Sequence, residues 1–370
     1  MSKEEKPQEI NLYRGLMTVL LVAFISIFIY GIFVNGWDKV AVDEVYIGNN
    51  GEGVTATASA FWVMMTFWVG FLFYMLLFTL AWERWPLPMC VSLDKRIQSV
   101  LVFVVSAVAA HLTEWMVTQG HPAKVELINY YWLMADLILF LLIWTLGFGA
   151  WPLAKINMDK QPMKGAVISA GLLVIALIIY VIGNEDKTRF ADYTGLYIPT
   201  LFIMICWYLW YILLMDRWPF ADLKQPINGV VTALIPAILT LLTYLAAADW
   251  VDKDPPTHMN MANRTWDYIT FTGVWLFWIL VVVFVWKGWP ATIKPSLGEQ
   301  PIKGIVLLFF TGALAAITQY VWLWTVGGAD NLIDVGFGPF ADELLLLAVW
   351  FYVVLVSLVL YLGIHWEQTV

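Results

Sequence analysis

The sequence predicts an all-α polytopic membrane protein with ten transmembrane helices. Apolar residues make up 61% of the 370 positions and charged residues 13%, whereas soluble domains carry about 25% charged residues. Ten mostly apolar runs each approach the length of about 20 residues that crosses a bilayer. A short motif also follows every second run from the second to the eighth, which indicates that the helices form repeated pairs.

The ten runs extend along the whole chain, and the loops between them are short. They are residues 15–35, 59–82, 97–116, 128–150, 165–183, 195–215, 229–248, 268–286, 304–325 and 342–364. No small-residue cleavage pattern follows the first run, so we expect it to stay as a membrane anchor. Residues 1–370 are therefore predicted to form one integral membrane domain.

The distribution of Lys and Arg predicts that both termini are cytoplasmic. With the N-terminus inside, the cytoplasmic segments hold 14 of the 20 Lys and Arg residues and the outer segments hold 6. Cationic loops stay on the cytoplasmic side of a membrane. We expect a protein of the bacterial inner membrane.

The outer loops and helix ends carry 16 Asp and Glu residues, so the outer face is acidic. Such a face attracts cations or a basic extracytoplasmic protein and repels anions at low salt. The alternative is a solvated surface that follows from the orientation alone.

The repeated motif has two parts and a period of about 67 residues. Trp-Pro recurs with spacings of 66, 67 and 71 residues, where each even-numbered run reaches the cytoplasmic interface. A Gln-Pro-x-x-Gly element then begins the next run. Tryptophan anchors a helix end at headgroup level, and proline cannot continue that helix but is accepted in a first turn. The copies are Trp85-Pro86, Trp151-Pro152, Trp218-Pro219 and Trp289-Pro290, with the second element at Gln161, Gln225 and Gln300.

We therefore predict about five helix pairs. Four units cover residues 59–116, 128–183, 195–248 and 268–325, and the fifth is split between 342–364 and 15–35. Two arrangements fit this pattern. Either the last helix packs beside the first and closes a ring, or the pairs form two helix bundles without a central path.

Asp136 is a charged residue inside a predicted span. It lies fifteen residues before the tryptophan of its unit, where the other units have Gly70, Ile203, Val274 and Phe351. A polar group at membrane depth must be buried in protein or line water, which makes Asp136 a candidate for function.

The preceding helix carries His111 and Glu114, which lie on one helical face because they are three residues apart. A short outer loop joins this helix to that of Asp136, so we expect the three side chains at similar depth. Together they could relay protons, bind a cation or hydrogen-bond a quinone headgroup. Alternatively, Glu114 reaches the surface and His111 bonds a neighbouring carbonyl. These residues alone make a poor metal site, and none is predicted.

Four polar residues share one register, fifteen residues after the glycine that starts their helix: Tyr30, Tyr180, Tyr244 and Gln319. They form either a polar collar at the outer mouth of a path or an outer aromatic belt. Pro236 lies in mid-span, where we expect it to kink its helix and free a backbone carbonyl.

The sequence carries no catalytic motif and no motif for an intrinsic cofactor. Of the four histidines, only His111 lies clearly inside a predicted span, so a bis-histidyl haem is not expected. Phosphate-binding glycine loops and serine nucleophile elbows are missing too. We expect a protein that is not an enzyme, that contacts membrane lipid and that binds no nucleic acid.

Two functions fit best. The first is a transporter or channel for a small cationic or neutral solute, proton-linked through Asp136, because internal repeats are common in transporters. The second is a non-haem membrane subunit of a larger respiratory or quinone-linked electron-transfer complex that docks an extracytoplasmic protein. A lipid-modifying enzyme is a third reading without a recognisable nucleophile. Solute, coupling, partner and oligomeric state, whether homo-oligomer or hetero-complex, stay open.

Overall fold

The described part of the computed structural model is helical apart from two short strands, which confirms the predicted all-α class. The structure describes residues 45–46, 53–54, 67–89, 95–120, 124–184, 201–251, 264–293 and 295–325. The strands β1 (Val45–Tyr46) and β2 (Gly53–Val54) form one antiparallel pair. The predicted spans 15–35 and 342–364, and with them Tyr30, lie outside the described residues.

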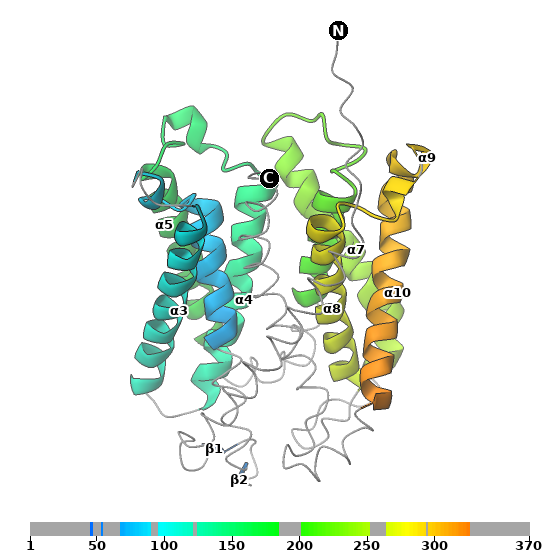
Figure 1. Ribbon diagram of the computed structural model, residues 1–370. Coiled ribbons are helices and arrows are strands. Elements are labelled where there is room, and N and C mark those ends of the chain that lie inside the picture. The colour runs from blue at the N-terminus through cyan, green and yellow to red at the C-terminus, as the bar shows by residue number, and fades with distance from the viewer. Residues whose placement is uncertain are drawn as a thin grey trace.

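The helices run side by side, with the Trp-Pro segments and α9 at one end and the strand pair at the other (Figure 1). Four π-helical turns continue α-helices, and three short 3₁₀ turns begin directly after the prolines of three of the Trp-Pro pairs. In chain order the helical elements are residues 67–76, η1 (Leu77–Ala81), η2 (Leu87–Met89), α3 (Lys95–Gly120), α4 (Lys124–Leu142), η3 (Ile143–Gly147), η4 (Leu153–Ile156), α5 (Met163–Asn184), residues 201–209, η5 (Trp210–Leu214), α7 (Ile227–Val251), α8 (Arg264–Leu280), η6 (Val281–Val285), η7 (Ala291–Ile293), α9 (Pro295–Gly298) and α10 (Ile302–Thr325).

Helix length and hydropathy support part of the predicted topology. Two described helices, Ile227–Ala246 within α7 and Ile302–Val321 within α10, are long and apolar enough to cross a membrane. Shorter apolar helices of 10–17 residues are Phe67–Ala81, Val100–Met116, Leu133–Gly147, Met163–Ile179, Leu201–Leu214 and Phe271–Phe284. The ten predicted spans are therefore not confirmed.

Four helices make up most of the buried core. We call them the core helices: residues 67–81, α4 with η3, residues 201–214, and α8 with η6. In the first of them six consecutive residues, 68–73, are all buried. A helix that is apolar on every side belongs in the interior, so these helices form the centre around which the others pack.

The remaining long helices, α3, α5, α7 and α10, each expose an apolar face. We call them the peripheral helices. On α7 this face consists of Val230, Leu234, Ile238, Leu241, Leu242 and Leu245, which are 46% to 61% exposed. Extended apolar surfaces of this kind mark contact with a membrane or with another protein.

Each core helix ends in the same backbone conformation. After the π turn comes one residue with negative φ, then two residues with positive φ, and then a Trp-Pro pair whose peptide bond is cis. The left-handed pairs are Glu83-Arg84, Gly149-Ala150, Asp216-Arg217 and Lys287-Gly288. Left-handed residues cannot continue a right-handed helix, so this pair, ahead of the proline, ends each core helix.

A glutamine joins each of three peripheral helices, α5, α7 and α10, to the core helix of the preceding unit. The Nε2 group of Gln225 donates to the carbonyl of Gly147 at 2.8 Å, and its Oε1 accepts from the Gly229 N–H at 3.1 Å. The last carbonyls of a helix and the first N–H groups of the next have no partner within their helices. One side chain therefore satisfies a group at each of two helix ends. The same pair of bonds links Gln161 to Ala81 and Gly165, and Gln300 to Leu214 and Gly304.

The glycine of each Gln-Pro-x-x-Gly element lies against a bulky side chain of the same preceding unit. A Cβ atom built on Gly229 would overlap the ring of Phe148. Likewise Gly165 faces the indole of Trp82, and Gly304 faces Met215. All three bulky residues occupy one register, directly after the π turn. Glycine is required here because the helix backbone must approach a large side chain closely.

An ion pair lies beside two of these three contacts between a peripheral helix and the preceding core helix. Lys303 pairs with Asp216 at 2.7 Å, and Lys164 pairs with Glu83 at the equivalent position. In the unit between them both partners are replaced, by Gly149 and Asn228. There the Asn228 Nδ2 group instead donates to backbone carbonyls of the Phe220–Leu223 turn.

Substitution of Gly229 by alanine tests the close approach. We expect the variant to lose about 1–3 kcal/mol of unfolding free energy because the added methyl group overpacks the contact with Phe148. Gly312 on α10 is the matched control, since a Cβ there meets nothing within 4 Å. Gly312→Ala is expected to gain about 0.5–1 kcal/mol from the better helix propensity of alanine. Unfolding of purified protein in detergent measures both, and an equal response of the two variants would contradict the interpretation.

Candidate functional site

Asp136 is buried in the middle of α4, with 3% of its surface exposed. Gly70, Ile203 and Val274, which occupy the same register of the other core helices, are buried as well. This register therefore faces the interior in all four units. Only the second unit places a carboxyl group there.

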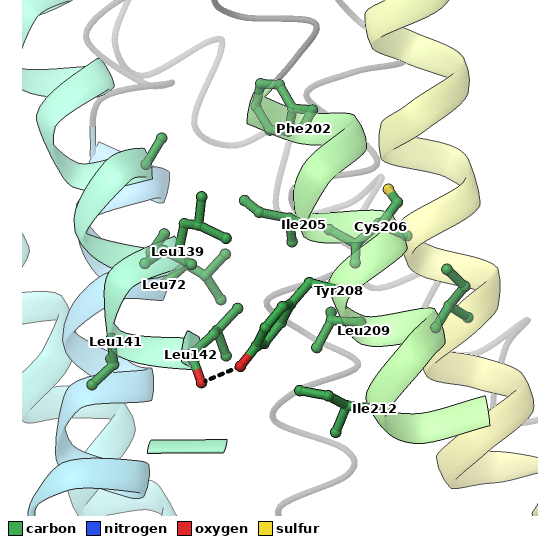
Figure 2. Packing of buried hydrophobic residues seen from close by; sticks show 14 of the residues in the cluster. Leu72, Leu139, Leu141, Leu142, Phe202, Ile205, Cys206, Tyr208, Leu209 and Ile212 are labelled. Atoms are coloured by element: carbon green, nitrogen blue, oxygen red, sulfur yellow. Dashed lines mark hydrogen bonds between the residues drawn. The ribbon is translucent and has the colours of Figure 1, made fainter. Parts of the chain in front are cut away.

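The surroundings of α4 are tightly packed and apolar. Figure 2 shows Leu139 and Leu142 of α4 facing Leu72 on one side and Ile205 and Tyr208 on the other. The Tyr208 hydroxyl donates to the carbonyl of Leu142 at 3.0 Å. An ionised carboxyl group in such a medium is costly unless polar groups compensate it, which keeps Asp136 a candidate for function.

Glu114 is the second buried carboxyl group among the described residues of α3 and α4. It is 4% exposed, so it does not reach the surface as the alternative interpretation required. His111, three residues earlier, has a side chain that is 62% exposed, and its Nδ1 lies 3.9 Å from Glu114 Oε2. The imidazole therefore lies on the outside of α3 and contacts a carboxyl group that points inward.

The structure separates the three candidates more than the sequence suggested. Because α3 ends at Gly120 and α4 begins at Lys124, His111 lies nine residues and Asp136 twelve residues from the connecting loop. At about 1.5 Å per residue this is a depth difference of about 4.5 Å. The exposed imidazole and the buried Asp136 are not enclosed together, whereas His111 and Glu114 form a pair.

The predicted collar residues share a register in the structure too. Tyr244 in α7 and Gln319 in α10 are half-buried, and Tyr180 lies at the equivalent position of α5. Counting from Ser99, which stands in place of the glycine in α3, Glu114 occupies this register. The role of these residues as a collar stays a prediction.

Pro236 is buried inside α7, and the helix continues through it from Ile227 to Val251. Thr232 and Thr240 lie one turn before and one turn after it, and both are buried. The Thr240 hydroxyl has no hydrogen-bond partner within the described part of the chain. Since proline also leaves the carbonyl four residues earlier without its N–H partner, the buried face of α7 carries a short polar stripe.

A repeated hydrogen bond between aromatic and threonine side chains was missed at the sequence level. Trp207 Nε1 donates to Thr243 at 2.9 Å, and Trp278 Nε1 donates to Thr318 at 3.0 Å. Tyr74 and Thr113 are hydrogen-bonded in the same registers of the first unit. The unit that contains Asp136 has Phe140 and Ile179 there, so it loses both partners together. Comparing each register across the repeat could have revealed this exchange.

Metal chemistry has no support in the part of the chain that the structure describes, where His, Cys, Asp and Glu form no group of three or more that could hold an ion. Comparison of the chain with protein-family models, with curated proteins and with solved structures finds no match.

Replacing Asp136 by leucine tests whether the carboxyl group is kept for function rather than for folding. If the carboxyl group is not needed for folding, its replacement by an apolar side chain should lower the unfolding free energy by no more than about 1.5 kcal/mol, as other tolerated core exchanges do, and we expect this outcome. Ile203→Asp, in the same register, is the matched control and should lose about 3–5 kcal/mol. Thermal unfolding in detergent compares them, and a strong loss for Asp136→Leu would assign the carboxyl group a structural role.

Proposed function

We propose that the chain is an integral protein of the bacterial inner membrane. The observation that carries this proposal is the apolar outward face shared by α3, α5, α7 and α10. Such faces are stable against lipid tails but not against water. The proposed topology has ten spans in five pairs, with the Trp-Pro ends and both termini in the cytoplasm.

The charges near the Trp-Pro ends support this orientation. Arg84, Lys155, Arg217 and Lys287 all lie in the segments that directly follow the core helices. Lys155 also lies 5.6 Å above the ring of Trp151, a cation–aromatic arrangement suited to the headgroup region. Cationic residues at membrane boundaries favour the cytoplasmic side.

Within this membrane protein we propose transport of a small cationic or neutral solute, with Asp136 as the proton- or cation-linked group. The supporting observation is its burial among apolar core helices at a register where no other described unit has a charge. Thr232 and Thr240, which lie one turn on either side of Pro236 in α7, add buried hydroxyl groups to the same core. Buried ionisable groups of this kind mark ion and proton pathways.

The tight packing of the core helices favours a transporter that opens alternately over a permanently open channel. Side chains fill the surroundings of α4 on the sides seen in Figure 2. A solute would reach Asp136 only when the core helices move apart. Alternating access by movement of repeat units around a central site is a general behaviour of repeat-built transporters.

Asp136→Asn in proteoliposomes tests this function. Radiolabelled methylammonium serves as the cationic probe and glycerol as the neutral one. We expect the parent to raise the flux of one probe above that of empty liposomes, and Asp136→Asn to lower it at least tenfold, while Ile203→Val keeps the parent rate. Equal flux of parent and Asp136→Asn across pH would remove Asp136 from the path.

A second candidate is a subunit of a larger membrane complex, favoured by the exposed His111 on α3. A polar side chain on an otherwise apolar membrane face indicates a neighbour in the membrane. Purification in mild detergent followed by mass spectrometry separates the candidates. Stoichiometric redox partners support the subunit, and a chain that purifies alone or as a homo-oligomer excludes it.

A further inference from the structure

His111 stands out among the outward faces of the peripheral helices. It lies twelve residues after Ser99, and the same register, counted from the starting glycine, holds Leu177, Leu241 and Ala316 in the other three helices. All of these side chains are exposed. The repeat thus provides an internal control: one unit has an imidazole where the others have aliphatic side chains.

The orientation of the imidazole is set by Glu114. Nδ1 lies 3.9 Å from Glu114 Oε2, and the side chain as a whole is 62% exposed, so we take Nε2 as the ring nitrogen available to a ligand. A carboxylate near Nδ1 favours the tautomer that carries its proton there, which leaves Nε2 as a hydrogen-bond acceptor in the neutral ring. In the imidazolium form Nε2 becomes a donor. The pair can therefore face either a hydroxyl group or a carbonyl group.

Neighbouring positions of α3 carry exposed apolar side chains. Trp115, one turn further along α3, is 52% exposed, as is Leu112 beside it. Val108 is 53% exposed on the preceding turn. An aromatic ring and aliphatic groups around one polar atom suit a planar headgroup that carries one or two oxygen atoms.

We propose that His111, Glu114 and Trp115 bind the headgroup of an isoprenoid quinone or quinol that enters from the bilayer. The quinol hydroxyl donates to Nε2, or the quinone carbonyl accepts from the protonated ring, while Glu114 orients the imidazole and Trp115 contacts the ring. This proposal rests on the membrane location and on the second candidate function. It differs from the transport site because it uses the lipid-facing side of α3 and not Asp136.

Photolabelling with an azido-quinone tests the site in the full chain reconstituted in phosphatidylcholine nanodiscs. We expect labelled peptides from α3, and we expect excess decylubiquinone to suppress the labelling. His111→Leu, which installs the residue of the α5 and α7 registers, should lower it at least tenfold. Glu114→Gln should lower it about threefold, because a neutral amide attracts the imidazole less strongly than a carboxylate does. Leu177→Ala on α5 is the matched control and should label like the parent.

Several outcomes would overturn the proposal. They are equal labelling of the outward faces of α3, α5 and α7, labelling that decylubiquinone does not suppress, and undiminished labelling of His111→Leu. If His111→Leu fails to fold, Trp115→Leu, which installs the residue found at Leu245 of α7, replaces it with the same expectation. A lipid-soluble crosslinker that joins two copies through α3 without quinone protection would assign the face to a second copy. Retention in the nanodisc is scored on the same sample, so a failure of membrane insertion is distinguished from a failure of quinone binding.

Discussion

The unsatisfied carbonyl groups at the ends of the core helices are the constraint on which the arrangement of the peripheral helices depends. Each π turn is followed by a left-handed pair, so the helix stops abruptly and its last carbonyls face the next unit. At the ends of residues 67–81, η3 and η5, a glutamine of the next unit donates to one of these carbonyls and also accepts an N–H at the start of its own helix. Because both bonds come from one side chain, the starts of α5, α7 and α10 are fixed relative to the preceding core helix.

The rest of the architecture follows from that joint. The helices α7 and α10 each pack against the core helix of their own pair through a Trp–Thr hydrogen bond, such as that of Trp207 with Thr243, and against the preceding core helix through a glycine. Two buried sides leave one side exposed, and this side is apolar in all four peripheral helices. The same geometry encloses the core helices, which explains how α4 can carry Asp136 far from solvent. The scaffold that buries Asp136 is the same one that carries Gly70, Ile203 and Val274 in this register of the other described units.

Part of this structure could be predicted from the sequence. Composition predicted the all-α class, which is confirmed, and the Trp-Pro and Gln-Pro pairs marked the helix boundaries closely. The π turns and left-handed pairs could not be predicted, because Glu83-Arg84 and Lys287-Gly288 share no residue type that requires a positive φ. The two hydrogen bonds of each glutamine could not be predicted either, because the carbonyl to which it donates lies 78 to 86 residues earlier in the chain.

The directions of the side chains at the candidate site could not be predicted from the sequence either. Hydropathy does not distinguish the two sides of a helix that is apolar all round, so the inward direction of Glu114 and the outward direction of His111 were not predictable. A spacing of three residues leaves about 60° between two side chains on a helix, as the 3.6-residue turn implies. At the edge of the buried face this angle separates a buried carboxyl group from an exposed imidazole.

The most direct test of the account measures which side of each helix faces lipid. Spin labels are placed at positions 177 and 241 on the peripheral helices and at position 203 on a core helix, in a chain whose Cys90 and Cys206 are replaced by alanine and which is reconstituted in liposomes. We expect that oxygen, which concentrates in the bilayer, relaxes the labels at 177 and 241 strongly while a water-soluble nickel complex does not, and that neither reagent reaches position 203. Strong relaxation of the labels at 177 and 241 by the nickel complex would contradict it.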